Sequence, residues 1–223
     1  MEKILCNSEA DFNLVNKIKK EEFKVIKDLK NDDRSKVTLI DIDGNKYVYK
    51  IPKEKNKRIW QRITSLIRGS ESKREYENYL RIKENGFKGP VPIMYWERKN
   101  FGICVDSFLV SSYLSGKPAT QKNLKLVEKE LRKIHARGYL HGDSQLSNFI
   151  VENNEIYLID AKLMKNKYGK AGEAYEFIYL EESCHKEIDV YDKNTLSYKL
   201  AKILNSYLHW IGRVKKAIRG KER

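Results

Sequence analysis

The sequence predicts an α+β protein with a small antiparallel sheet in its N-terminal part and a mainly helical C-terminal part. Short runs rich in β-branched and aromatic residues recur within the first 114 residues. From residue 120 the apolar residues return at spacings of three and four, which is typical of helices. Between these regions Ser115-Gly116-Lys117-Pro118 breaks both patterns. We therefore expect two lobes, 1–114 and 115–223, joined by a hinge.

The predicted strands are rich in Val, Ile, Phe and Tyr, and they cover residues 23–26, 36–42, 46–51, 93–96, 101–105 and 107–114. Asp43-Gly44 separates the second from the third and is a strong hairpin signal, so these two strands should pair antiparallel. In the third strand the tyrosines alternate with Val48 and Lys50. Because successive side chains of a strand point to opposite faces, Lys50 is expected on the face away from the tyrosines.

Helices are predicted in both lobes. Residues 53–68 are basic and amphipathic, which fits either a surface helix packed on the sheet or a membrane or substrate contact. A second helix runs from Ser72 to near Gly86, and a third from Thr120 to Gly138. Residues 161–185 are predicted to be polar and irregular, and the last third to be largely helical. Its apolar stripe consists of Leu196, Leu200, Ile203, Leu204, Tyr207, Leu208, Ile211 and Val214.

The charge of the chain indicates an anionic partner. Its 223 residues carry a formal net charge of +14, with six basic residues and one glutamate in the tail from Arg213 to Arg223. Nucleic acid, an acidic membrane surface and a phosphorylated substrate all fit this charge, as does a simply solvated lysine-rich surface. Three widely spaced cysteines indicate neither a disulfide framework nor a zinc site. With no apolar stretch of membrane-spanning length, the protein is expected to be soluble and cytoplasmic, or peripheral on a membrane.

The most informative stretch runs from His141 to Asn148, with the sequence HGDSQLSN. It presents Asp143 and, five positions later, Asn148 before an apolar strand; a second strand then ends on Asp160. Mg²⁺ prefers hard oxygen ligands, and an attacking hydroxyl needs a proton acceptor, so three such groups together suit phosphoryl transfer. Taken alone, each is more readily explained as a turn or strand-end residue. The three together, at this spacing and between apolar strands, favour phosphoryl transfer.

This order of parts resembles the protein-kinase-like fold, with HGD in place of HRD. The resemblance implies that Asp143 accepts or orients the substrate hydroxyl, that Asn148 and Asp160 hold Mg²⁺, and that Lys50 contacts the ATP phosphates with Glu75 as its partner. Two alternatives stay open for Glu75. It can cap its own helix in an S-x-x-E box with Ser72, or Glu77 can replace it as the partner of Lys50. His141 is expected to support the loop structurally.

Several departures argue against a peptide substrate. The turn 29–36 lacks glycine, so a glycine-rich phosphate cradle is absent and other amides, or Arg34 and Lys36, must hold the nucleotide. Ala161-Lys162 replaces Phe-Gly after Asp160, no proline follows, and Gln145 stands where protein kinases have lysine. A small-molecule or glycan acceptor is therefore favoured.

The motif, the short chain and the basic helical C-terminus resemble the bacterial lipopolysaccharide core heptose(II) kinase family. This implies ATP-dependent phosphorylation of a heptose hydroxyl on a lipid-linked core oligosaccharide, at the anionic inner face of the cytoplasmic membrane, with no nucleic-acid partner. Alternatives are a kinase of another sugar or small molecule, an atypical protein kinase, or a catalytically inactive kinase-like module that binds anionic lipid or nucleic acid.

Overall fold

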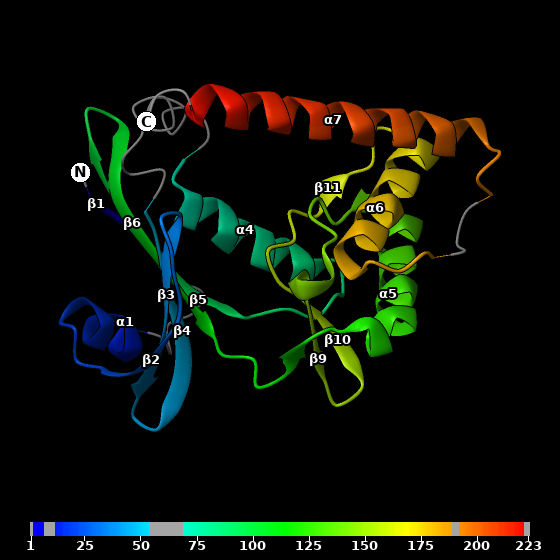
Figure 1. The fold of residues 1–223 in the computed structure, drawn as a ribbon. Coiled ribbons are helices and arrows are strands. Elements are labelled where there is room, and N and C mark those ends of the chain that lie inside the picture. The colour runs from blue at the N-terminus through cyan, green and yellow to red at the C-terminus, as the bar shows by residue number, and fades with distance from the viewer. Residues whose placement is uncertain (1, 7–11, 54–68, 189–191, 221–223) are drawn as a thin grey trace. The chain divides into compact units, whose positions relative to one another are not determined.

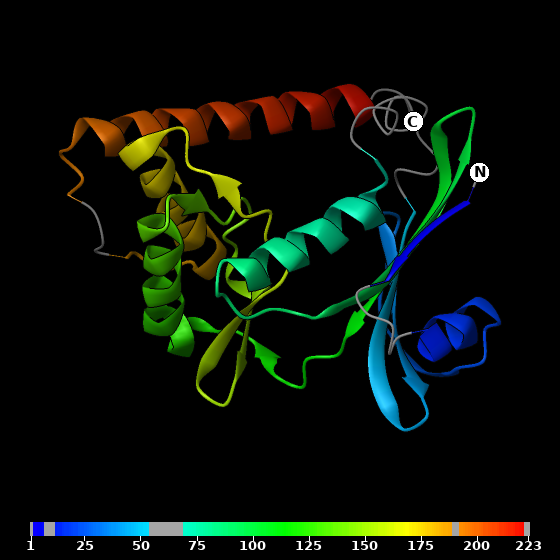
Figure 2. The same cartoon turned by 180° about the vertical axis from the view of Figure 1, so that it is seen from behind.

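The computed structural model describes residues 2–6, 12–53, 69–188 and 192–220. The chain folds as two compact units, Met1–Ser115 and Gly116–Arg223 (Figures 1 and 2). Apart from Lys53, the basic helix predicted for residues 53–68 lies outside the described residues.

In its described residues the first unit contains a six-stranded antiparallel sheet and two helices. The strands follow the order β1-β5-β6-β4-β3-β2 across the sheet. Their bounds are β1 Glu2–Cys6, β2 Lys24–Asn31, β3 Ser35–Ile42, β4 Asn45–Pro52, β5 Pro92–Asn100 and β6 Ile103–Ser112; the helices are α1 Phe12–Lys19 and α4 Glu71–Glu84. The predicted antiparallel sheet is confirmed, but β1 and α1 were not predicted.

Two tight turns fix the hairpins of this sheet. In β3–β4, Ile42 pairs with Asn45 across Asp43 and Gly44, whose φ angles of 55° and 81° suit a two-residue hairpin. This confirms the predicted pairing. Phe101 and Gly102 form the corresponding turn between β5 and β6, again with positive φ. The two strands predicted for 101–105 and 107–114 are therefore wrong, because residues 103–112 form one strand.

The sheet separates two groups of packed side chains. On one face Ile40, Met94 and Val110 pack with Val15 and Ile18 of α1. On the other face α4 contacts the sheet through aromatic rings such as that of Tyr76, whose centroid lies 5.3 Å from the ring centroid of Tyr95. Figures 1 and 2 show α1 and α4 on opposite sides of the sheet. Tyr47 and Tyr49 pack with the α1 cluster, so the alternation of β4 directs Lys50 toward α4, as predicted.

The second unit is mainly helical. Its helices are η2 Gln121–Asn123, α5 Leu124–Ala136, η3 Leu146–Asn148, α6 Gly169–Cys184 and α7 Leu196–Gly220. Its short strands are β7 Lys117–Pro118, β8 Tyr139–Leu140, β9 Phe149–Glu152, β10 Glu155–Leu158 and β11 Met164–Lys165, arranged as β10-β9-β7 and β11-β8. The helix predicted to end at Gly138 is confirmed by α5, which buries Val127, Leu131 and Ile134.

Helix α6 corrects the prediction that residues 161–185 are irregular. Its buried residues are Gly172, Ala174, Glu176, Phe177, Ile178, Leu180 and Cys184. These positions lie around much of the helix circumference, so the sequence contains no clean apolar stripe. A helix buried on several sides lacks the periodicity that marks a surface helix.

Helix α7 has the predicted apolar stripe, but most of the stripe is exposed. Ala201 packs on Ala174 and Ile178 of α6, and Asn205 Nδ2 donates to Glu182 Oε1 at 2.5 Å. In contrast, the side chains of Ile203, Tyr207 and other stripe residues are about half exposed or more. Within the described residues no helix is both long and apolar enough to cross a membrane.

Candidate active site

The loop between β8 and β9 brings the three predicted phosphotransfer residues of the second unit together. Asn148 directly precedes β9 and Asp160 follows β10, and these two strands form an antiparallel hairpin with Phe149 opposite Leu158. At its open end Ile159 N donates to Asn148 O at 3.0 Å. Asn148 Nδ2 in turn donates to the carbonyl of Asp143 at 2.9 Å. The hairpin thus holds Asn148 between Asp143 and the segment that ends in Asp160.

The burial and the pKa of the Asp143 carboxyl suit a group that accepts a hydrogen bond or a proton from a ligand. Its Oδ1 atom is buried and has no hydrogen-bond partner among the described residues. Burial raises the pKa of the carboxyl above its usual value, and the charge of Asp160 raises it further; Lys162 and hydrogen bonds from Asn148 and Gln145 oppose this shift. A buried oxygen without a partner is costly unless a ligand supplies the hydrogen bond, so this geometry suits binding of a hydroxyl.

Asn148 and Asp160 offer the donor atoms that Mg²⁺ prefers. Because the side-chain nitrogen of Asn148 is bound to Asp143, the Oδ1 atom is the donor that remains for a metal. Within the described part of the chain no three His, Cys, Asp or Glu residues are arranged to hold a metal ion. Mg²⁺ is commonly held by one or two protein oxygens together with substrate phosphates and water. The two residues therefore fit Mg²⁺ that arrives with a nucleotide.

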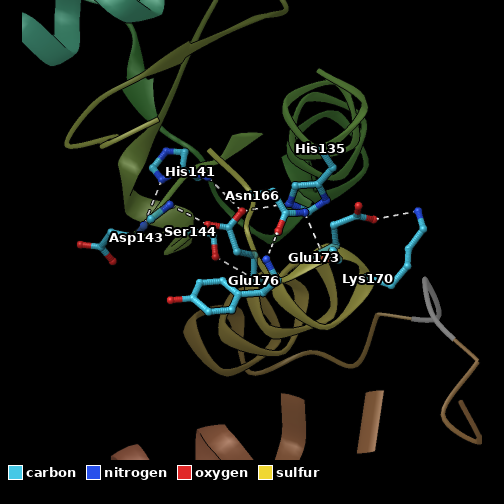
Figure 3. A network of polar contacts seen from close by, with 11 residues as sticks. His135, His141, Asp143, Ser144, Asn166, Lys170, Glu173 and Glu176 are labelled. Atoms are coloured by element: carbon cyan, nitrogen blue, oxygen red, sulfur yellow. Dashed lines mark hydrogen bonds and ion pairs between the residues drawn. The ribbon is translucent and has the colours of Figure 1, made fainter. Parts of the chain in front are cut away.

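Glu176 of α6 binds the loop from His141 to Asn148, the predicted catalytic loop, and was missed by the sequence analysis (Figure 3). Its Oε2 atom accepts from His141 N at 3.0 Å and contacts His135 Nε2 at 2.9 Å, and its Oε1 atom accepts from Gly142 N at 2.6 Å. Ser144 Oγ donates to the carbonyl of Glu176 at 2.8 Å. A buried carboxylate that accepts backbone N–H groups fixes their direction, so Glu176 sets the path of the loop on both sides of Gly142.

His141 has the structural environment expected for it. The residue is fully buried, its ring lies 4.8 Å from that of Phe149, and Nδ1 accepts from Asp143 N at 3.4 Å. Burial lowers the pKa of His141 to about 4. The imidazole is therefore neutral near pH 7 and supports the loop from inside.

Gly142 allows Lys162 to lie across the loop. The backbone of Gly142 has φ of +85°, and a Cβ atom there would lie 3.1 Å from Lys162 Cβ and 3.3 Å from Met164 Cε. Lys162 N donates to His141 O at 2.8 Å and its Nζ atom to Gly142 O at 3.3 Å. A side chain at the second position of the HGD motif would therefore strain the backbone and displace Lys162 or Met164.

In the first unit Lys50 and Glu75 form an ion pair. Lys50 Nζ lies 2.8 Å from Glu75 Oε1, and Tyr79 OH donates to the same oxygen at 2.9 Å. Glu77 instead pairs with Lys73 at 3.6 Å.

The capping-box alternative for Glu75 is wrong. Ser70 is the N-cap of α4 and accepts from Lys73 N at 3.1 Å. Ser72 is buried and donates to Ser107 Oγ, so it caps nothing.

The turn between β2 and β3 is shorter than predicted, since β2 continues to Asn31. Asp32 Oδ1 accepts from the backbone nitrogens of Arg34 at 2.9 Å and Ser35 at 2.8 Å. The carboxylate thus occupies amides that a phosphate cradle would use and adds negative charge to the turn. The backbone amides of Arg34 and Ser35 are therefore not available to replace a glycine-rich loop in phosphate binding.

The five predicted site residues fall into two groups. Lys50 and Glu75 are brought together in the first unit, and Asp143, Asn148 and Asp160 in the second. Their catalytic roles stay predictions.

Comparison with known proteins gives the family. Residues 5–211 match the model of the family described as lipopolysaccharide core biosynthesis protein (WaaY). Two similar relatives, both named lipopolysaccharide core heptose(II) kinase WaaY, come from Escherichia coli and from its strain K12. They are 30% identical over 149 residues and 26% identical over 161 residues. The aligned region spans 62% of this chain and 63% of the first relative, and 69% of each chain for the second.

A solved structure supports the fold. A structure titled WaaP in complex with acyl carrier protein matches with a TM-score of 0.55 and 18% identity, over 96% of this chain and 98% of that one. At this identity the likeness concerns the fold alone, and it confirms the predicted kinase-like α+β architecture. Because the family model matches residues 5–211, most of the chain, the chain belongs to the WaaY family of lipopolysaccharide core biosynthesis proteins.

Proposed function

We propose that this protein is an ATP-dependent, Mg²⁺-dependent kinase that phosphorylates a heptose hydroxyl of the lipopolysaccharide inner core. The observation that supports this most directly is the buried Oδ1 atom of Asp143, which has no hydrogen-bond partner in the described part of the chain. Asn148 bonds to the same residue, and Asp160 follows the hairpin that Asn148 precedes. Membership of a family whose relatives are named heptose(II) kinases supports the choice of acceptor.

In the proposed reaction each residue has a separate task. Asp143 accepts a hydrogen bond from the acceptor hydroxyl, orients it toward the γ-phosphate and takes up its proton. Asn148 and Asp160 hold Mg²⁺, which neutralises phosphate charge when bound. Lys50, oriented by Glu75, binds the α- and β-phosphates. Since Asp32 occupies the turn amides of Arg34 and Ser35, Lys50 takes a larger share of phosphate binding than in a kinase with a glycine-rich loop.

The proposal is tested by incubating the protein with ATP, Mg²⁺ and dephosphorylated core glycolipid, and following the mass of the glycolipid. One added phosphate is expected, and Asp143→Asn should slow its formation by roughly 10²- to 10⁴-fold, because the variant retains the shape but cannot take up the proton. Asp106→Asn, at a surface ion pair of the first unit, is the matched control.

Two outcomes would redirect the proposal. Phosphate transfer to another sugar but not to the core glycolipid would show that the proposed acceptor is wrong, while the proposed phosphoryl transfer would stand. Failure of the wild-type protein to bind ATP with Mg²⁺ would favour the inactive-module alternative.

We further propose that α7 contacts the anionic inner face of the cytoplasmic membrane. Ile203, Tyr207, Trp210 and Val214 are spaced by four, three and four residues, so they share one side of the helix, and all four are exposed. Exposed Lys199, Lys202 and Arg213 border this side. An apolar stripe flanked by cations suits the headgroup region of an anionic bilayer, and the net charge of +14 favours the same partner.

Co-sedimentation with vesicles tests this surface. Vesicles of phosphatidylglycerol and phosphatidylethanolamine should bind the protein, more weakly at high salt, and vesicles of phosphatidylcholine alone should bind it poorly. The double variant Ile203→Ser, Trp210→Ser should bind the anionic vesicles roughly tenfold less tightly, because two apolar side chains no longer enter the bilayer. Phe101→Ser, at an exposed hairpin turn, is the control. Equal binding of both variants would exclude α7 as the contact.

A further inference from the structure

The second unit contains a pocket of about 480 Å³ that begins at the catalytic loop. Gly142, Asp143, Ser144 and Lys162 line one part of it, and Leu200, Leu204 and Leu208 of α7 line another. Its volume lies within the range of about 300–1,000 Å³ that is usual for small-molecule sites. All of its lining residues belong to the second unit, and none of them is a proposed metal ligand.

Two tyrosines of α6 line this pocket together with Asp143. The rings of Tyr175 and Tyr179 are nearly parallel, at 11°, with centroids 6.2 Å apart. Tyr179 OH accepts from Gln145 Nε2 at 2.8 Å, and Gln145 belongs to the catalytic loop. Tyr175 directly precedes Glu176, the residue that fixes the loop. The pair is therefore tied to the loop that carries Asp143 at two points.

Nothing in the proposed phosphate chemistry requires these rings. Both are only partly buried although α6 is otherwise buried at neighbouring positions, and both line the pocket, so part of each ring is accessible to a ligand. Burial raises the pKa of Tyr175, and its hydroxyl is therefore a neutral donor near pH 7. A flat apolar surface edged by hydroxyl groups is complementary to a pyranose ring, which has C–H groups on its faces and hydroxyl groups around its rim.

We infer that Tyr175 and Tyr179 form the binding platform for the acceptor saccharide, against which a sugar ring stacks while one of its hydroxyl groups reaches Asp143. This inference rests on the proposed kinase function for its acceptor. It also gives Gln145 a task. At the position where protein kinases have lysine, Gln145 bonds to Tyr179 and so holds the platform against the loop that carries Asp143.

The polar groups at the catalytic end favour a saccharide over an alkyl chain. Asp143 has a buried oxygen in need of a donor, and Lys162 and the two tyrosine hydroxyls offer further hydrogen bonds at the same end. An alkyl chain placed there would give the buried Oδ1 atom of Asp143 no hydrogen-bond donor, whereas a sugar hydroxyl would supply one. The leucines of α7 also line the pocket and suit the less polar part of an amphiphilic acceptor.

Binding can be measured without catalysis. Saturation-transfer NMR with deacylated core oligosaccharide and no ATP should show the strongest transfer to the ring C–H protons of the bound sugar. Tyr175→Leu and Tyr179→Leu are each expected to weaken binding by about tenfold, since the flat face is lost. Tyr175→Phe retains the ring and should stay within about threefold of the wild type. Phe101→Leu is the control for an aromatic residue outside the pocket, and thermal melts verify folding of every variant.

Kinetics separate this inference from the proposed function. In the transfer assay, loss of the Tyr175 ring should raise KM for the oligosaccharide by about tenfold with little effect on KM for ATP. Transfer and binding that are unaffected by both leucine variants would overturn the platform and leave the kinase reaction intact. Ring-dependent binding without phosphate transfer would support the platform and overturn the reaction. Competition for the pocket by decanoate but not by oligosaccharide would assign it to an alkyl chain.

Discussion

At the residue scale, the ion pair of Lys50 and Glu75 leads to a direct comparison within one helix. Glu75→Gln removes the charge that orients Lys50 and should raise KM for ATP by roughly tenfold, equivalent to about 1.4 kcal/mol. Glu77→Gln changes the same residue type two positions later, where the partner is Lys73 on the surface, and should leave KM within twofold. Equal effects of the two substitutions on ATP kinetics would contradict the assignment.

His141 should make folding stability depend on pH. Its folded-state pKa of about 4 lies below the ordinary value of 6.5, so below pH 6.5 the unfolded chain binds a proton that the folded chain excludes. The free energy of unfolding should therefore fall between pH 6.5 and pH 4, by up to about 3 kcal/mol from this group.

Urea unfolding at pH 7.0 and 4.5 measures this dependence. His141→Asn lacks the titrating group and should lose less stability on acidification than the wild type. His185→Asn is the control, because His185 is exposed in a left-handed C-cap that asparagine also adopts. A loss in His141→Asn as large as that in the control would show that burial of His141 does not cause the effect.

Residue types and spacing were sufficient to predict some of the site but not its supports. Asp143, Asn148 and Asp160 stand at short, fixed separations on a loop and hairpin, so local sequence indicates their proximity. Lys50 could be placed on its face from strand alternation alone. Glu176 is separated from the loop by more than thirty residues, and its neighbours gave no helical stripe, so no local pattern connects it with His141.

At the element scale, α6 connects the catalytic loop to the helical core. Three of its residues bond to the loop: Glu176, Tyr179 and Ser183 with their side chains, and Glu176 also with its carbonyl oxygen. Phe177 and Ile178 of the same helix are buried. The helix thus positions the loop from a part of the molecule that packing makes rigid.

Glu176→Gln tests this positioning. The glutamine nitrogen would face the N–H of His141 or Gly142, and two donors cannot bond to each other. We expect a loss of about 1–3 kcal/mol in the free energy of unfolding and a lower kcat, with KM for ATP little changed. Glu187→Gln, at an exposed pair after α6, is the control. Normal kcat in a folded Glu176→Gln protein would remove the positioning role.

The elements that the sequence did not reveal are those that depend on tertiary contacts. Helix α1 has eight residues, too few to be stable alone, and buries Val15 and Ile18 only by packing on the sheet. By contrast, the β3–β4 hairpin was predictable because Asp43-Gly44 specifies its turn locally. The apolar stripe of α7 was also visible, but whether such a stripe packs inside a protein or remains exposed depends on what surrounds it.

At the scale of the whole molecule, nucleotide binding should appear as stability. A ligand that binds only the folded chain adds about 2.7 kcal/mol at a concentration one hundred times its Kd. ATP with Mg²⁺ should therefore raise Tm, and removal of Mg²⁺ by a chelator should lower it again. Asp160→Asn should lose the Mg²⁺-dependent part of this shift, and Asp106→Asn should retain it. A full shift without Mg²⁺ would exclude Asp160 as a metal ligand.

The close approach of Lys162 to Gly142 limits which segments can be exchanged between this protein and other kinases. Gly142→Arg would turn HGD into HRD, yet the new side chain would start 3.1 Å from Lys162 Cβ on a backbone with φ of +85°. The HGD loop therefore cannot be exchanged with that of another kinase on its own. A working transplant in either direction would have to include Lys162, Met164 and the α6 carboxylate, so chimaeras that exchange the motif alone should be inactive.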